Sequence, residues 1–448
     1  MLDLKKIHVP PKIKNAVCSL PDGLFNAVSF VLILIFMLDP LFMFIRMRCF
    51  SWFPCFWDYI NRVTLGAGAV LILLFVLRHC FTHGKPDIKQ FLKSNLPITL
   101  FLGFAVLMII TTALNGNFYI MIHGFSYRKE GLLGYLGYIV CFIIIAMNSS
   151  ETLKKNWLYI FAGTSAVLEL ATIYEHYALD FYDTAFVFHH YNHYGYYLLV
   201  SLAVSGMLIS VSQKIWQKII FSVTFFIAVL ALVINDTFGC QIAALAGLVF
   251  ACVMYSLAKS KFKAVTLVPI VLFVCTFIFA GATSEKLNTN ISNNLFQIQN
   301  DAVAISEGKD NAEFSTGVSR LILWENGMKY IAEEPFKGHG ADATLGRLFA
   351  DSNGDAERCH CEYMNYAICF GIPAALIYIA AVFSVYLRGL LARKKLTDIN
   401  LIGLGAAMFY LISAAIANTM YYTAPFLFIL LGMGYFRDTE PEQKPLSE

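Results

Sequence analysis

Long apolar segments recur along almost the whole chain, separated by short polar stretches. We place about twelve of them, at 24–46, 63–79, 96–114, 131–148, 156–175, 195–212, 215–234, 239–258, 263–282, 364–387, 399–419 and 422–436. About 20 apolar residues in a helix cross the hydrocarbon core of a bilayer. Closed barrels also satisfy the backbone in lipid, but they show alternating rather than continuous apolar positions. The pattern therefore predicts an all-α, polytopic membrane protein with about twelve transmembrane helices.

The composition supports this class and argues against several others. Hydrophobic residues make up 58% of the 448 residues, and charged residues only 14%. No polybasic tract accompanies an aromatic-rich soluble region, so nucleic-acid binding has no support. The eleven cysteines are scattered, several inside apolar segments where they act as small hydrophobic residues. They form no disulfide framework, although Cys49 and Cys55 could pair in one outer loop.

The positions of lysine and arginine predict the orientation in the membrane. With a cytoplasmic N-terminus, the inner segments hold 21 of the 33 basic residues, the short outer loops hold five, and one long segment holds the remaining seven. Cytoplasmic loops carry such an excess. The first apolar segment is longer than a signal peptide and lacks a small-residue cleavage site, so we expect it to remain as a span. Both termini are therefore predicted to be cytoplasmic.

One extramembrane segment stands out by its length. We divide the chain into helices at 1–282, an outer loop at 283–360, further helices at 361–436 and a tail at 437–448. Within the loop, the sequence "VSRLILWENGMKYIAEE" predicts a helix because apolar residues recur at helical spacing, namely Val318, Leu321, Trp324, Met328 and Ile331. Pro335 is expected to end this helix, and a short second helix is expected in "GHGADATLGRLF".

Polar residues gather at the predicted outer ends of the spans. They include "SYRKEG" (126–131), "FHHYNHYG" (188–195), "NDTFG" (235–239) and "CHCEY" (359–363), whereas the inner loops contain mainly basic anchors. No P-loop or dinucleotide-binding glycine motif is present. Chemistry at the outer face has no ATP available, so it must draw its energy from an activated substrate.

Two basic positions are candidates for binding phosphate. Arg320 precedes Trp324 by four residues, so both lie on one face of the predicted loop helix. An arginine side chain suits a phosphate because its planar group donates paired hydrogen bonds, and a solvated helix arginine is the alternative. Arg128 and Lys129, followed by Glu130, place basic charge on the predicted outer side, against the positive-inside trend, which suggests a functional role. Snorkelling of these side chains at the membrane interface is the alternative.

The histidines admit several interpretations. His189, His190 and His193, with Asn192, could form a metal site, but no His-x3-His pair shares a helix face and the tyrosine-rich context suits an aromatic belt. His360 could accept a proton from a hydroxyl group. It could equally be a polar helix start, or join Cys359 and Cys361 in a metal clamp, although adjacent ligands seldom converge on one ion. We expect no metal or other cofactor.

Four stretches resemble the O-antigen ligase and polymerase family of bacterial envelopes. They are "SYRKEGLLGYLGYIV" (126–140), "HHYNHYGYYLLVSLAV" (189–204), "LVINDTFGCQIAALAG" (232–247), and "GVSRLILWENGMKYIAEEPFKGHGAD" followed by "CHCEYMNYAICFGIPAALIYI". The last pair is similar to the family pattern of Arg-x3-Trp, Pro-x2-Gly-x-Gly, His-x-x-Tyr and Phe-Gly-Ile-Pro. The chain departs from the family at 236–239, where many members have Ser-Arg-Gly and this chain has Asp-Thr-Phe-Gly. Either Arg128 or an outer-loop arginine such as Arg46 or Arg48 takes the role of the missing arginine, or the donor is held differently.

The resemblance implies a GT-C-like glycosyltransferase of the bacterial cytoplasmic membrane. It implies an undecaprenyl-diphosphate-linked glycan donor and a glycan or glycolipid acceptor, with metal-independent transfer and inversion at the anomeric carbon. Arg320 and His360 would be catalytic, and the predicted substrate-binding residues are Arg128, Glu130, Asn192, His193, Trp324 and Tyr363.

Other functions stay open at this stage. Asp39 and Glu169 lie inside predicted spans, where carboxylates are functional hypotheses by default. A flippase for lipid-linked oligosaccharide or a proton-coupled permease is therefore the alternative, and a sensor or scaffold is a further one. Ligase and polymerase share a donor and differ mainly in acceptor, so the sequence does not separate them.

Overall fold

The computed structural model describes residues 10–54, 59–83, 88–116, 118–125, 129–181, 185–188, 190–260, 264–306, 320–351, 357–417 and 421–437. Within these ranges the chain forms helices and no strand. The helices are α1 (Pro11–Cys18), α2 (Asp22–Arg48), α3 (Ile60–His83), α4 (Ile88–Ser94), α5 (Leu96–Asn115), α6 (Phe118–His123), α7 (Leu132–Met147), α8 (Glu151–Ala178), α9 (Tyr191–Val211), α10 (Ile215–Asn235), α11 (Phe238–Lys259), η2 (Ala264–Leu267), α12 (Val268–Thr283), α13 (Glu285–Ser306), α14 (Arg320–Glu333), α15 (Leu345–Asp351), α16 (Glu362–Leu391), η4 (Arg393–Lys395), α17 (Asp398–Ala414) and α18 (Ala424–Gly434).

Each predicted apolar segment is helical, but the helices differ in length. Among the described residues, nine are long and apolar enough to cross a membrane, including α2, α5, α9 and α16. The other three, α7, α17 and α18, are shorter apolar helices. At about 1.5 Å per residue, α18 is roughly 16 Å long, well short of the hydrocarbon core. A multi-pass helical membrane protein is confirmed, whereas the count of twelve crossings stays a prediction.

The short helices form the interior of the bundle. The α18 helix packs against both α7 and α17, and α17 also packs against α9 and α11. Nearly all side chains of α17 and α18 are buried. A helix enclosed by other helices has its apolar surface covered by protein, so it has no need to match the thickness of the lipid. This enclosure explains why predicted spans as different in length as α16 and α18 occur in one bundle.

The α9 helix is at the centre and carries several hydroxyl groups. Its apolar stretch is entirely buried, between α8, α10, α11 and α17. The hydroxyls of Thr172 and Tyr194 are 2.6 Å apart, and those of Ser165 and Tyr197 are 2.9 Å apart, which joins α8 to α9. Small and polar contacts of this kind join helices in lipid, where burial of apolar groups alone gives little drive for association.

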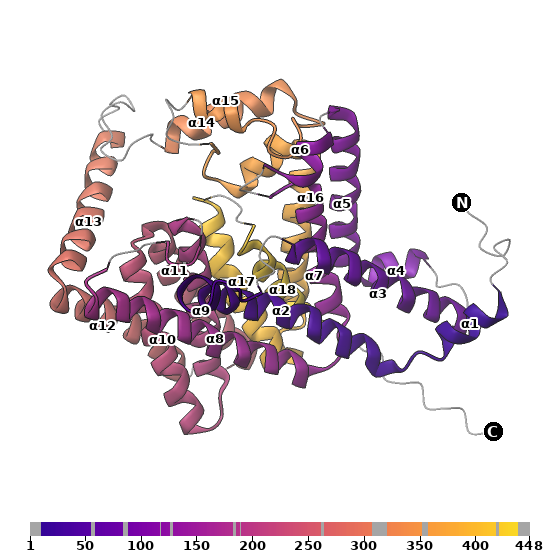
Figure 1. The fold of residues 1–448 in the computed structure, drawn as a ribbon, viewed down its shortest axis with the longest axis horizontal. Helices are drawn as coiled ribbons and strands as arrows, with labels where there is room; N and C mark the ends of the chain where they lie inside the picture. Colours follow the sequence, from indigo (N-terminus) through magenta and orange to yellow (C-terminus); the bar gives the residue numbers. More distant parts are fainter. Residues whose placement is uncertain are drawn as a thin grey trace.

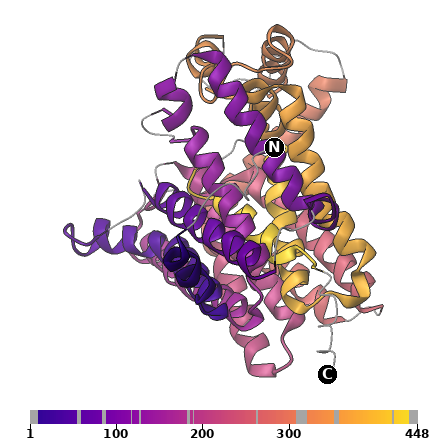
Figure 2. The same cartoon turned by 90° about the vertical axis from the view of Figure 1, so that its right-hand side faces the viewer.

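The α14 and α15 helices, with the turn between them, lie at one end of the molecule over α6 and the upper parts of α5 and α16 (Figures 1 and 2). We call residues 320–351 the cap. The expected loop helix is present as α14, which stops before Pro335, and the expected second helix is α15. Arg347 of α15 forms two 2.9 Å hydrogen bonds with Glu333 of α14, and its guanidinium lies 4.4 Å from the centre of the Tyr330 ring.

A break in α16 holds the cap on the bundle. Gly371 has φ +82° within the helix, which permits the bend, and Pro373 has no N–H to donate to the carbonyl of Cys369. The carbonyls left free at the break, those of Ile368 and Cys369, accept the N–H groups of His339 and Gly340 at 2.8 Å. In return, Ile372 donates to the carbonyl of Pro335, also at 2.8 Å. The Pro-x2-Gly-x-Gly and Phe-Gly-Ile-Pro motifs are therefore bonded to each other through their backbones.

Candidate active site

Arg358 is the centre of a buried group of charges just before α16. Its side chain is 1% exposed, and its guanidinium forms ion pairs with the carboxylates of Glu130 and Asp342. The second Asp342 oxygen accepts the backbone N–H of Phe125 at 3.0 Å. We call Arg358, Glu130 and Asp342 the Arg358 cluster. It joins the loop between α6 and α7, the turn of the cap and the segment that leads into α16.

The cluster is stable only while its charges are matched. A buried ion has lost its hydration, and removing one partner of a buried pair commonly costs about 3–5 kcal/mol. Burial alone lowers the pKa of Arg358, but the two carboxylates outweigh that effect and raise the pKa above its usual range. The guanidinium is therefore permanently charged. Its role in this geometry is to hold three segments together.

The backbone around the cluster has an uncommon conformation. Lys129, Asp342 and His360 have φ values of +56°, +56° and +49°. Residues other than glycine seldom adopt this left-handed region, which costs about 1–2 kcal/mol per residue. Lys129 precedes Glu130, Asp342 belongs to the cluster, and His360 follows Arg358 by two residues. Such strain persists where the surrounding structure enforces it, and it is common at functional sites.

Two glycines close the loop between α6 and α7. Gly124 has φ +77°, and a Cβ atom added there would lie 2.6 Å from the nitrogen of Gly131. A Cβ atom at Gly131 would likewise meet the backbone of Gly124 and His123. The Gly that follows Glu130 in the predicted Arg-x-Glu-Gly motif is thus required for close approach of two backbone segments. Arg128 itself lies outside the described residues, between two ends that this contact fixes.

In the sequence, His360 follows Cys359, which has a buried thiol, and precedes Glu362, which has a buried carboxylate. Cys359 is fully buried, its thiol donates to the carbonyl of Cys361 at 3.4 Å, and burial raises its pKa to about 12. The side chain of His360 is half-buried, and its backbone has the left-handed conformation described above. Among the described residues, no three His, Cys, Asp or Glu side chains are grouped as metal ligands, the 359–361 stretch included.

Glu362 begins α16 and is surrounded by tyrosines. Its carboxylate is buried and accepts the hydroxyl of Tyr378 at 2.9 Å and that of Tyr410 at 3.3 Å. Its place in the first turn also sets the carboxylate beside the positive end of the helix dipole. The bond to Tyr410 connects α16 to α17 at a position two residues after His360. Glu362 therefore fixes the start of the helix to which the His360 turn is attached.

The other predicted residues lie on several elements. Arg320 is the first residue of α14, but its side chain lies outside the described part of the chain. Trp324, on α14, is partly buried against the core, and its indole N–H has no hydrogen-bond partner among the described residues. Tyr363 donates its hydroxyl to the carbonyl of Leu411 at 2.9 Å. Glu130 has its carboxylate in the Arg358 cluster, so we assign it to holding the loop.

Asn192 and His193 occupy the first turn of α9, next to the turn between α10 and α11. Asn235 donates its amide to the carbonyl of Tyr191 at 3.0 Å, which joins these two predicted motifs. The His193 ring is 5.3 Å from the ring of Tyr422. His189 lies outside the described residues, as does Cys55, the proposed partner of Cys49.

Sequence reasoning overlooked Arg358, Asp342 and Glu362. One signal was available: Arg358 is a basic residue directly before an apolar segment on the predicted outer side, where such residues are scarce. The partners of Arg358 could not be identified from spacing, because they come from the distant positions 130 and 342.

These features define a polytopic helical membrane protein whose cap is bonded to a broken helix beside a buried charged turn. Residues 223–379 match the family model described as O-antigen ligase. The matched stretch includes the cap, the Arg358 cluster except Glu130, His360 and the break in α16. The match confirms the resemblance over the motif stretches that it contains, namely 232–247 and the pair around the cap and the start of α16. The match supports a glycan-transferring role in the synthesis of surface polysaccharides. No curated protein matches the chain.

Proposed function

We propose that the protein transfers a glycan from a polyprenyl-diphosphate donor to a sugar hydroxyl of an acceptor, at the outer face of the bacterial cytoplasmic membrane. The observation that supports this most strongly is the turn at His360. A half-buried imidazole lies there in a left-handed conformation beside the Arg358 cluster, within the region that matches the O-antigen ligase family.

The reaction exchanges one bond for another. The acceptor hydroxyl attacks the anomeric carbon of the donor, the new glycosidic bond forms, and the bond from that carbon to the diphosphate oxygen breaks. Attack from the face opposite the diphosphate inverts the anomeric configuration. The donor bond supplies the energy, which suits a compartment without ATP.

The proton and the developing charge have separate partners in this proposal. The imidazole of His360 accepts the proton of the acceptor hydroxyl as the hydroxyl attacks, a contribution that is typically worth about 10²–10⁴-fold in rate. Arg320 and Arg128 stabilise the negative charge that accumulates on the departing diphosphate. Arginine suits this task because it stays charged and donates paired hydrogen bonds to phosphate oxygens.

The Arg358 cluster and Glu362 position the imidazole. Both flank His360 in sequence, and both bond to elements far away along the chain: the α6–α7 loop and the cap for Arg358, α17 for Glu362. Glu130, two residues after Arg128 in the sequence, belongs to the same cluster, which supports a role for Arg128 near the proposed base. Trp324 is partly buried on α14 of the cap, where an aromatic ring could stack on a sugar.

The proposal is tested with purified protein in liposomes that contain a labelled polyprenyl-diphosphate oligosaccharide and an acceptor glycan. Glycosyl transfer yields a longer glycan or a glycosylated acceptor, together with free polyprenyl diphosphate. Movement of intact donor across the bilayer without a new glycosidic bond would contradict the proposal. Product analysis separates the two enzyme types, because a polymerase lengthens lipid-linked chains whereas a ligase moves whole chains to a second acceptor.

One observation favours the transport alternative. Glu169 of α8 is fully buried inside the bundle, beside the hydroxyl of Ser201 on α9. An intramembrane carboxylate of this kind is common in proton-coupled carriers. The liposome experiment decides between the two functions, and a Glu169→Gln variant that still transfers glycan at the wild-type rate would show that transfer does not depend on this carboxylate.

A further inference from the structure

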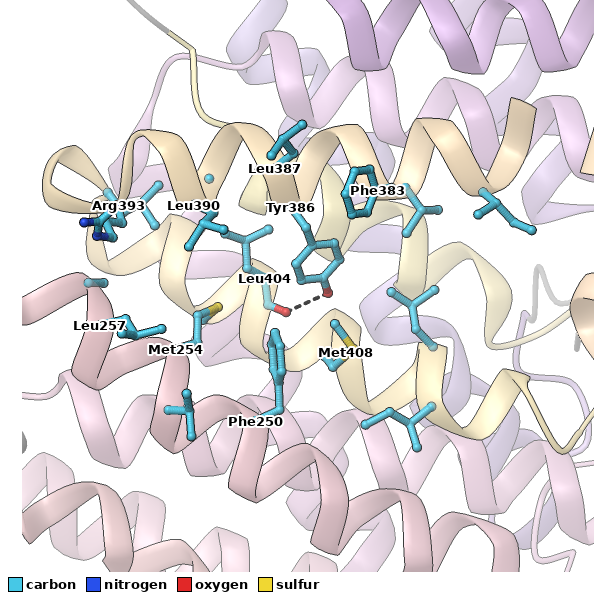
Figure 3. A pocket seen from close by; sticks show the side chains of 18 of the residues that line it. Phe250, Met254, Leu257, Phe383, Tyr386, Leu387, Leu390, Arg393, Leu404 and Met408 are labelled. Atoms are coloured by element: carbon cyan, nitrogen blue, oxygen red, sulfur yellow. Dashed lines mark hydrogen bonds between the residues drawn. The ribbon is translucent and has the colours of Figure 1, made fainter. Parts of the chain in front are cut away.

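A deep apolar groove opens on the side of the bundle between α11, α16 and α17. Its volume is about 630 Å³, within the range of about 300–1,000 Å³ usual for ligand sites. Figure 3 shows Phe250 and Met254 of α11 facing Phe383, Tyr386 and Leu390 of α16 across it. Among the residues that line the groove, Arg393 is the only charged one, and it lies at one end.

The surface of the groove is almost entirely apolar. The hydroxyl of Tyr386 is bonded to the carbonyl of Leu404 at 2.8 Å, and the hydroxyl of Tyr363 is bonded to that of Leu411. Both tyrosines therefore offer only their rings. Val253 and Phe383 on its walls are exposed at the lipid-facing surface. The ligand that fits is an apolar chain that enters sideways from the bilayer, and a sugar or peptide finds no polar partner along these walls.

The length of the groove distinguishes between possible chains. Its upper end is set by Tyr363, which is bonded to Leu411, and its lower end by Arg393 and Leu396. From Leu411 back to Asp398, where α17 begins, the helix extends about 20 Å at roughly 1.5 Å per residue. One leaflet accounts for only half of the roughly 30 Å hydrocarbon core, about 15 Å. A phospholipid tail from either leaflet ends before it fills this length, whereas a polyisoprenoid chain continues past the midplane.

One end of the groove lies close in sequence to the candidate active site. Tyr363 is in the first turn of α16, directly after Glu362 and three residues after His360. A lipid with its chain in the groove and its head group beyond Tyr363 would have that head group at the His360 turn. Along the chain, the His360 turn comes before α16 and the groove follows along α16. A lipid-linked glycan has the same order, with the glycan and diphosphate first and the apolar chain after them.

We propose that this groove between α11, α16 and α17 holds the isoprenoid chain of the donor, with the diphosphate at the Tyr363 end and the chain directed towards Arg393. The assignment rests on the proposed function, because that function supplies a polyprenyl-diphosphate substrate. The groove assignment adds to the proposed function where the isoprenoid chain binds and from which side it enters. It also requires an isoprenoid chain longer than the thickness of one leaflet.

The test uses undecaprenyl diphosphate without sugar, carrying a photoreactive diazirine in its isoprenoid chain, and the full-length protein in nanodiscs. Val253→Trp fills the groove from its α11 wall. Val249→Trp is the matched control, since Val249 is one turn away on the same helix, is equally exposed (51% against 52%) and does not line the groove. Mass spectrometry of the labelled peptides reports where the chain lies.

We expect adducts on α11 and α16 residues of the groove in the wild type and in Val249→Trp, and at least about tenfold fewer in Val253→Trp, a loss of about 1.4 kcal/mol in binding. Unlabelled undecaprenyl diphosphate should displace the probe, and phosphatidylglycerol should not. Equal labelling of the groove by a diazirine phosphatidylglycerol, with no displacement by undecaprenyl diphosphate, would overturn the proposal in favour of an ordinary bilayer lipid.

Binding and transfer are measured separately, so the two proposals fail in different ways. If the probe binds in the groove but the wild type makes no glycosidic bond, the proposed function is wrong and the groove assignment stands. If Val253→Trp transfers glycan with unchanged kcat and KM, the groove assignment is wrong and the proposed function stands.

Discussion

Arg358 and His360 are two residues apart, yet the side chain of Arg358 is buried and that of His360 is partly exposed. The cost of burying the guanidinium is offset only by Glu130 and Asp342, so the three side chains are interdependent. His360, in turn, keeps a backbone conformation that few residues adopt. At the scale of single residues, the site therefore combines a buried, permanently charged arginine that holds the backbone with a partly exposed histidine two residues later.

The interdependence of the cluster predicts a specific pattern of stability. Arg358→Met leaves two buried carboxylates without a cation, so we expect the free energy of unfolding to fall by about 3–5 kcal/mol. Adding Glu130→Gln and Asp342→Asn removes the unmatched charges and should recover more than half of that loss. Thermal unfolding in detergent measures both changes.

Arg347→Met is the control for this experiment. Arg347 forms its paired hydrogen bonds with Glu333 on the surface of the cap, where solvent screens the ion pair and it adds little to stability. Equal destabilisation by Arg347→Met and Arg358→Met, or no recovery in the triple variant, would contradict the account of the cluster.

The thiol of Cys359 provides a second prediction at this scale. Its pKa is raised to about 12 by burial, so at pH 7 only about one thiol in 10⁵ is ionised and reactive. We expect N-ethylmaleimide to label the exposed Cys49 rapidly in folded protein and Cys359 only after denaturation. Mass spectrometry of the digested protein measures both sites. Labelling of Cys359 at the rate of Cys49 would show that the segment before α16 is open.

At the scale of elements, the break in α16 connects the cap to the bundle. The N–H groups of His339 and Gly340 replace donors that a continuous helix would supply, so the two motifs complete each other's hydrogen bonding. In a straight α16 the carbonyl of Ile368 would accept the N–H of Ile372 instead, so the cap turn would lose one of its two acceptors. The proposed base, two residues before α16, is thereby linked to the position of the cap.

Gly371→Ala tests this link. The residue has φ +82°, and an added Cβ would lie 2.6 Å from the carbonyl carbon of Phe336, so we expect a loss of more than about 2 kcal/mol in stability. Gly163→Ala, in α8, is the control, because a Cβ there meets nothing within 4 Å, and its effect should stay within about 1 kcal/mol. Thermal unfolding of both variants gives the answer, and equal midpoints would exclude a structural role for the break.

At the scale of the whole molecule, the features that could be predicted from the sequence are those that depend on local composition. Apolar segments and helical spacing identified the apolar helices, and also α14 with its end before Pro335, because each depends on neighbouring residues. The long polar helix α13 (Glu285–Ser306) was not predicted. The Arg358 cluster depends on residues 130, 342 and 358, which only the fold brings together. The shortness of α18 is likewise non-local, since it follows from enclosure by other helices.

The distribution of basic residues predicts which way the whole bundle faces. Cysteine placed at Phe336, a strongly exposed position of the cap turn, should react with a membrane-impermeant maleimide on intact cells. Cysteine placed at Leu391, equally exposed at the other end of α16, should react only after the cells are permeabilised. The reverse pattern would place the cap in the cytoplasm and would remove the proposed site from the outer face.

The central claim is that His360 accepts the proton of the acceptor hydroxyl in glycosyl transfer. The most direct measurement compares kcat for transfer from a polyprenyl-diphosphate glycan by purified wild type and His360→Asn, since asparagine tolerates the left-handed φ of +49° and so preserves the turn. The account predicts a fall of about 100-fold or more with an unchanged unfolding midpoint. A His360→Asn protein that keeps kcat within about twofold of the wild type would contradict it.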